Sequence, residues 1–245
     1  MILSVTTIAW GKKKTPEGFE GVLHSIKDIG FEGVGIEGSK LPKELIHDPK
    51  MAREIIKKVG LENGGTYSRA RVQDIRWAKE SGTPLFWISV QDRPLSAAIR
   101  RLRNFSNAAS KQGIVAALHN ELRSSIETQE QIETTLGAIP TLKLCIDTAH
   151  GAGAGVDVLG LVEKYQKRLA LVHLKDLKSI LPKSKIRFRR DFVNAGDGAL
   201  DLKSVVKKLQ EVGYSGQLML EIEALQGESP DKVVKKGFEH VSSFF

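Results

Sequence analysis

Short apolar runs alternate with longer amphipathic segments along the chain. An apolar run bounded by turn residues is typical of a buried strand, and apolar residues three and four apart indicate a helix. Eight strands are predicted, over residues 2–8, 33–37, 61–67, 84–90, 114–118, 142–146, 169–172 and 217–220. A helix is predicted after each of them, over residues 15–28, 41–59, 68–81, 93–112, 122–136, 156–167, 200–212 and 230–245.

This order of elements favours one closed (β/α)8 TIM barrel spanning residues 1–245. Strands that alternate with helices indicate parallel pairing through crossover helices. The length of 245 residues suits a single barrel domain. No Gly-x-Gly-x-x-Gly follows an early strand, which counts against a dinucleotide-binding sheet. The one long connection, residues 177–199, exceeds the usual loop length and is therefore expected to be functional or disordered.

Polar side chains follow several of the predicted strands. Asp147 directly follows the apolar run 142–146, and His150 comes three residues later. A buried carboxylate is costly unless a group of opposite charge pairs with it, and a divalent cation is a common partner. Three more strands end in residues that can ligate a metal, namely His119, His173 and Glu221. The carboxyl ends of barrel strands are where active sites of this fold lie, so one metal site is predicted there.

Composition and charge narrow the function classes. Apolar residues make up 41% and charged residues 27%, as in an ordinary folded domain. No apolar run approaches the length needed to span a bilayer, and no signal peptide is recognisable, so no membrane association is expected. Cys145 is the single cysteine and fits a reducing compartment, so a cytoplasmic location is expected. The net charge of +8 comes from lysines spread over helix faces, so nucleic-acid binding is not expected.

Four short motifs, all in the second half of the chain, resemble one known family. The chain resembles the sugar-phosphate isomerase/epimerase superfamily, whose barrel is xylose isomerase-like and which includes endonuclease IV. The matching segments are Asp-Thr-Ala-His at 147–150, His-Leu-Lys-Asp at 173–176, Gly-Asp-Gly-Ala-Leu-Asp at 196–201, and Gly-Tyr-Ser-Gly at 213–216 with Leu-Glu-Ile-Glu at 220–223.

The resemblance implies one divalent metal ion, Mn, Mg, Co or Zn, held by residues from strands five to eight. Asp147, His173 and Glu221 correspond to three of the family's ligands. The fourth position departs from the family pattern, because this chain reads His119-Asn120-Glu121 where Glu-Asn-His or His-Asn-His is usual. We expect His119 as the ligand and keep Glu121, which lies on the same side of the strand, as the competitor.

The family's chemistry is proton removal next to a carbonyl group, and the expected activity is therefore that of a sugar or sugar-phosphate isomerase or epimerase. The resemblance implies Glu221 as the acid/base group, His150 on a substrate oxygen and Lys175 beside developing negative charge. A dehydratase of a cyclic polyol or keto acid, of the inosose or dehydroshikimate type, needs only one base and is the alternative. A metal-free sugar-binding barrel is the third hypothesis.

Substrate contacts are expected from residues around this centre. Glu37 ends the second predicted strand, and Glu121 is again a candidate. The basic loop at 183–190 contributes Arg187 and Arg190, which suit an anionic group of the substrate. A mobile basic loop is the competing interpretation. A three-zinc endonuclease site is not expected, because strands three and four lack terminal histidines. The expected partner is a small sugar-derived molecule, and a homodimer or tetramer is expected from the family.

Overall fold

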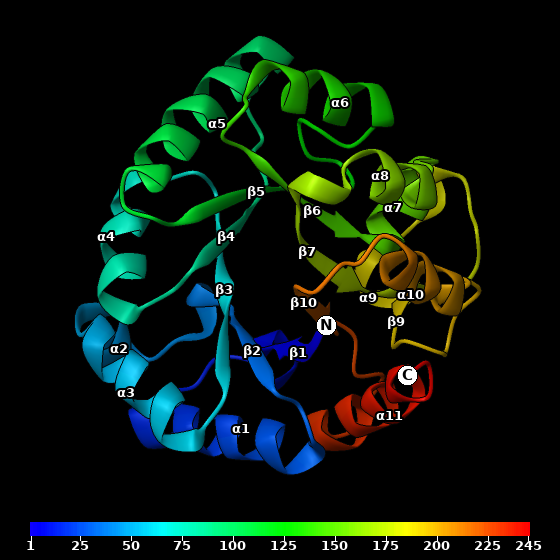
Figure 1. Cartoon of the computed structure of the whole chain (residues 1–245). Coiled ribbons are helices and arrows are strands. Elements are labelled where there is room, and N and C mark those ends of the chain that lie inside the picture. The colour runs from blue at the N-terminus through cyan, green and yellow to red at the C-terminus, as the bar shows by residue number, and fades with distance from the viewer.

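The structure is a computed structural model that describes residues 1–245, and it contains a closed barrel of eight parallel strands. Figure 1 shows these strands as a ring around the centre, with the helices outside. The barrel strands, in chain order, are β1 (Ile2–Thr6), β2 (Gly33–Ile36), β3 (Glu62–Ser68), β4 (Leu85–Ile88), β5 (Val115–His119), β6 (Lys143–Asp147), β7 (Leu169–Leu174) and β10 (Gln217–Leu220). The predicted (β/α)8 barrel is confirmed.

The ring closes by pairing of the last strand with the first. Residues 2–5 of β1 pair in parallel with residues 217–220 of β10. Outside the ring, the last helix lies beside the first, and the rings of Phe31 and Phe238 meet edge to face at 4.8 Å. The interior of the barrel is filled by Leu85, Trp87, Ala117, Cys145, Leu171 and Met219. The barrel is therefore a packed core whose polar residues collect at one end.

The helices pack their apolar faces on the strands. They are α1 (Pro16–Ile29), α2 (Lys43–His47), α3 (Pro49–Val59), α4 (Val72–Ser81), α5 (Leu95–Ser110), α6 (Gln129–Ala138), α7 (Thr148–Ala154), α8 (Val158–Lys164), α9 (Phe188–Asp191), α10 (Leu202–Glu211) and α11 (Pro230–Ser242). No helix is both long and apolar enough to cross a membrane.

Three predicted helices are divided or shortened. The segment 41–59 breaks at Asp48, whose side chain accepts a hydrogen bond from the Met51 amide and so begins a new helix, α3, before Pro49. The segment 122–136 is helical only from Gln129, because Thr128 and Gln131 form a capping box there. The helix predicted at 156–167 is shortened to α8, and an additional helix that was not predicted, α7, begins directly after Asp147.

The long connection predicted at 177–199 is ordered. It contains a two-stranded antiparallel sheet of β8 (Asp176–Leu177) and β9 (Phe192–Val193), with α9 between the strands. The buried carboxylate of Asp176 accepts hydrogen bonds from the amides of Leu177, Gly196, Gly198 and Leu200, at 2.8–3.1 Å. A side chain at Gly198 would collide with this carboxylate. Asp176 thus fastens both ends of the loop above the barrel.

Removing this carboxylate is expected to loosen the loop and destabilise the fold. Asp176→Ala leaves four backbone amides without their acceptor, and we expect the free energy of unfolding to fall by about 3 kcal/mol. Denaturant titration measures this loss. Asp201→Ala, which removes an exposed helix cap at α10, is the control and should cost about 1 kcal/mol. Equal losses in the two variants would contradict the role given to Asp176.

Candidate active site

Four metal-binding side chains converge at the carboxyl end of the barrel. His119 ends β5, Asp147 ends β6, His173 lies in β7, and Glu221 directly follows β10. One ligand atom from each lies within 4.8 Å of all the others. The histidine and aspartate side chains are at most 5% exposed, and the Glu221 side chain is 12% exposed. The structure therefore brings together the four residues that the sequence predicts as ligands.

Most donor atoms in this cluster have no hydrogen-bond partner. Both ring nitrogens of His119 and His173, Oδ2 of Asp147 and Oε2 of Glu221 are buried and lack one. Nδ1 of His173 lies 2.6 Å from Oε2 of Glu221, and Nε2 of His119 lies 3.6 Å from Oδ2 of Asp147, but neither pair is aligned as a hydrogen bond. Unpartnered buried polar atoms are costly, so their convergence fits a shared divalent cation.

One carboxylate oxygen of Asp147, Oδ1, is held by a backbone hydrogen bond, and this leaves Oδ2 directed at the cluster. Oδ1 of Asp147 accepts the amide hydrogen of His150 at 2.8 Å and begins α7. The side chain of Asn120 accepts the Asp147 amide hydrogen at 2.7 Å and donates to the Asp147 carbonyl at 3.1 Å. Asn120 thus fixes the backbone of β6 at the point where the carboxylate emerges, a role that sequence reasoning did not assign to it.

Lys175 places a buried positive charge beside the four ligands. Its ammonium lies 2.9 Å from Oε1 of Glu223, 3.4 Å from Oε1 of Glu221 and 3.7 Å from Oδ2 of Asp147. The side chain is 1% exposed. Although burial alone lowers the pKa of a lysine, the three carboxylates outweigh it and raise the pKa of Lys175. Lys175 therefore stays protonated. Glu223, its nearest partner, had no predicted role.

The carboxylates of the cluster remain ionised. Burial alone would raise the pKa of Glu221, but the neighbouring Lys175 ammonium outweighs burial and holds the pKa of Glu221 well below its usual range. The pKa of Asp147 is likewise lowered, against burial, by His150 and Lys175. Burial raises the pKa of the Cys145 thiol well above its usual value. Cys145 lies close to His119 and His173, but as a neutral thiol it is a weaker ligand than Asp147.

His150 is enclosed rather than open to the mouth of the barrel. Its Nδ1 accepts the amide hydrogen of Leu122 at 3.0 Å, and its ring packs against Phe192, Phe188 and His119 at centroid distances of 4.7–5.4 Å. Burial lowers the pKa of His150 to about 3. The ring is therefore neutral and connects the cluster to the loop that carries Phe188 and Phe192.

Glu121 lies near the cluster without belonging to it. Its Oε2 is buried and has no hydrogen-bond partner. Burial lowers the pKa of His119, but Asp147 and other carboxylates, Glu121 among them, outweigh it and raise that pKa. Burial raises the pKa of Tyr67, and the charge of Glu121 adds to the rise. The four-atom cluster contains His119 and not Glu121. Which of the two ligates the metal stays a prediction, with His119 as the residue placed for it.

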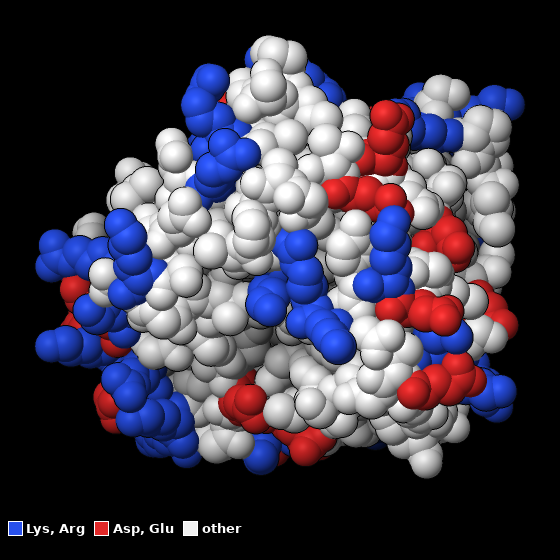
Figure 2. Space-filling view, turned by 45° about the horizontal axis from the view of Figure 1, so that its top comes forward, with Lys and Arg blue, Asp and Glu red and all other residues white.

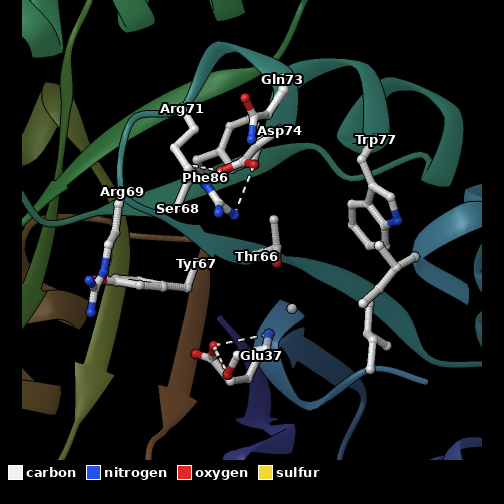
Figure 3. Close-up of a pocket in the computed structure, with 14 residues that line it drawn as sticks. Glu37, Thr66, Tyr67, Ser68, Arg69, Arg71, Gln73, Asp74, Trp77 and Phe86 are labelled. Atoms are coloured by element: carbon white, nitrogen blue, oxygen red, sulfur yellow. Dashed lines mark hydrogen bonds and ion pairs between the residues drawn. The ribbon is translucent and has the colours of Figure 1, made fainter. Parts of the chain in front are cut away.

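Glu37 and the two arginines occupy different surroundings. Glu37 lines a cavity of about 740 Å³ and accepts hydrogen bonds from the backbone and hydroxyl of Ser39 (Figure 3). Burial, with the nearby charge of Glu221, raises the pKa of Glu37. Arg187 donates to backbone oxygens of its own loop, and Arg190 forms a two-pronged ion pair with Asp191. Substrate contacts from Glu37, Arg187 and Arg190 remain predictions.

Figure 2 shows a hollow in the face of the molecule, with lysine and arginine side chains gathered on one rim and acidic side chains at the opposite edge. A second cavity, of about 480 Å³, is lined by residues of both charges, among them Lys40, Arg189 and Glu223. Since Glu223 pairs with Lys175, this cavity lies next to the cluster. The surroundings of the candidate site are thus polar and accessible to a small polar molecule.

Comparison with known proteins identifies the family. The model of the xylose isomerase-like TIM barrel family matches residues 70–244. The chain belongs to this family. An inosose dehydratase of Yersinia enterocolitica is 22% identical over an alignment of length 271, gaps included. The alignment covers 90% of this chain and 89% of that protein. Seven other curated relatives match over 43–47% of their own length, so the chain spans slightly less than half of each.

Two solved structures share the whole fold. The protein named IOLI, determined with a bound zinc atom, superposes with a TM-score of 0.80 at 18% identity, covering 100% of this chain and 99% of that one. An L-ribulose 3-epimerase superposes with a TM-score of 0.79 at 14% identity, covering 99% of this chain and 94% of that one. At these identities the likeness concerns the fold alone.

The depressed pKa of His150 predicts a pH-dependent stability. The unfolded chain binds a proton at this histidine below about pH 6.5, whereas the folded chain does so only near pH 3. The contribution of the neutral His150 to the free energy of unfolding is therefore fully present above about pH 6.5, and it is lost as the pH falls from there toward 3. His150→Asn keeps an acceptor for the Leu122 amide and should reduce the drop in melting temperature between pH 7 and pH 5.

The melting temperature is measured with a chelator present, so that metal loss does not contribute. His47→Asn, at an exposed histidine, is the matched control and should leave the drop unchanged. An identical pH dependence in wild type and His150→Asn would contradict the assignment of a neutral, buried His150.

Proposed function

We propose that this protein is a metal-dependent enzyme that acts on a sugar or cyclic polyol by removing a proton next to a carbonyl group. The observation that carries the proposal is the convergence of unpartnered donor atoms from His119, Asp147, His173 and Glu221 beside the buried ammonium of Lys175. Membership of the xylose isomerase-like family and the names of the relatives support it.

The four residues would hold the divalent ion, and such an ion supplies polarisation of a carbonyl or hydroxyl oxygen. Glu221 is ionised and accepts the proton from the carbon beside the carbonyl. The electron pair of that C–H bond moves toward the carbonyl oxygen, where the Lys175 ammonium stabilises the developing negative charge. His150 shapes the wall of the site, and Glu37 contacts a substrate hydroxyl. Each of these roles is part of the proposal.

The donor set bears on which metal is bound. Two imidazoles and two carboxylates suit zinc and cobalt better than magnesium, which prefers oxygen ligands alone. The bound zinc atom of the IOLI structure is consistent with this choice. We therefore propose zinc or cobalt ahead of manganese and magnesium.

Two reactions share this first step. An isomerase or epimerase returns the proton to carbon, whereas a dehydratase expels a hydroxyl group from the next carbon as water. An epimerase that works through two glutamates needs a second one on β5, where this chain has His119. Isomerisation of a sugar is the first candidate function. Dehydration is the second, and it is supported by the lack of a glutamate at the end of β5 and by the inosose dehydratase relative.

Incubation in D₂O with a panel of inososes, 3-dehydroshikimate and ketohexoses distinguishes these reactions. Proton removal next to a carbonyl predicts deuterium incorporation in NMR spectra for either reaction. Dehydration additionally produces an enone that absorbs in the ultraviolet. Glu221→Gln removes the base, and we expect its rate to fall at least about 10³-fold.

Glu228→Gln, an exposed glutamate on the next connection, serves as the control and should keep the wild-type rate. Absence of both deuterium incorporation and turnover over the whole panel, with zinc or cobalt bound, would contradict the proposed function. Retained activity in Glu221→Gln would contradict only the role of that residue.

A further inference from the structure

A side cleft runs outward from the mouth of the barrel, and the chemistry proposed above makes no use of most of it. This cleft is the cavity of about 740 Å³ between the segment after β2 and the start of α4. Figure 3 shows Glu37 and Tyr67 on one side of it and the indole of Trp77 on the other. A cavity of this size suits a drug-sized ligand, which is larger than one sugar ring.

The inner end of the cleft belongs to the same mouth as the metal-binding cluster. Glu37 directly follows β2 and Tyr67 lies near the end of β3, so both residues lie at the carboxyl end of the parallel barrel, where Glu221 follows β10. The Tyr67 hydroxyl lies 2.7 Å from the hydroxyl of Ser89, which follows the neighbouring strand β4. The cleft therefore lies beside the end of the barrel at which the cluster is found.

The outer end is apolar. It is formed by Leu41, Ile46, Trp77 and Phe86. The indole N–H of Trp77 already donates to the carbonyl of Leu45 at 3.1 Å, so the ring presents only its apolar surface to the cleft. Ile46 is 44% exposed although it is a large apolar residue. Among the polar side chains that line the cleft, Arg71 and Asp74 pair with each other at 3.1 Å.

We propose that the substrate has two parts, a polyhydroxylated ring at the cluster and an apolar or aromatic substituent in the side cleft. The substrate class is thus a glycoside or a similarly substituted sugar or cyclitol, in place of a free sugar. An aromatic substituent would bury the exposed face of Ile46 and pack on the ring of Trp77. This inference rests on the proposed function for the ring and on the cleft for the substituent.

The probes are phenyl β-D-glucopyranoside and methyl β-D-glucopyranoside, which share a sugar and differ in the substituent. Their dissociation constants for the zinc-loaded protein are measured by calorimetry. We expect the phenyl glycoside to bind at least about tenfold more tightly. Ile46→Ser should reduce this preference about fivefold without changing the affinity for the methyl glycoside.

Val72→Ser is the matched control, because Val72 is an exposed apolar residue of α4 that does not line the cleft. It should keep the wild-type preference. Equal binding of the two glycosides, absence of binding by both, or an unchanged preference in Ile46→Ser would overturn the inference. So would dissociation of a homo-oligomer in Ile46→Ser, because the cleft would then be covered by a second copy.

The binding experiment and the turnover experiment can fail independently, so failure of the cleft assignment is distinguishable from failure of the proposed function. If the phenyl preference and its loss in Ile46→Ser are found, but neither deuterium incorporation nor turnover occurs, the cleft assignment stands and the catalytic proposal falls. If turnover is found without a phenyl preference, the cleft assignment alone falls.

Discussion

The structure depends on one electrostatic constraint, which is that negative charge and unpartnered imidazoles are buried together at one end of the barrel. Asp147 and Glu221 are held ionised there in spite of burial. Lys175 compensates part of this charge, yet it leaves Oδ2 of Asp147 and both histidine rings without hydrogen bonds. A divalent cation would take one donor atom from each of these side chains at once, which a further lysine would not do.

The surrounding fold is arranged to hold these side chains in place. Adjacent parallel strands bring Asp147 and His173 into register as neighbours, and the start of α7 fixes the second oxygen of Asp147. The loop after β7 is fastened by Asp176 and carries Phe192, which packs on His150 and lies 5.1 Å from the Lys175 ammonium. The same loop therefore stabilises the fold and covers the charged cluster.

Much of the architecture could be predicted from the sequence, because buried strands and amphipathic helices have distinct periods. His119, Asp147, His173 and Glu221 were predicted for the same reason, since each follows an apolar run and all such ends meet at one rim. The break at Asp48 was missed because the apolar spacing continues across it, although Asp48-Pro49 is itself a signal for the start of a helix. Nor could α7 be predicted, since a strand-terminal aspartate that caps a helix has no periodic signal.

Other features depend on contacts between distant segments. The sequence identified Lys175 by its motif, but its enclosure by three carboxylates from β6 and from the segment after β10 requires the closed barrel. The side cleft combines Ile46 and Trp77, which belong to different helices and carry no motif. Short-range pattern therefore predicts the candidate ligands, whereas the charge balance and the shape of the site follow only from the packing.

Anomalous X-ray diffraction from crystals grown with zinc tests the central claim most directly. The account predicts one peak bounded by His119, Asp147, His173 and Glu221, at about 2.0–2.2 Å from their ligand atoms, and its loss in Asp147→Ala. A peak that contacts Glu121 in place of His119 would correct one ligand. No peak at this position with zinc, cobalt or manganese would contradict the account, and the barrel would then be a metal-free one.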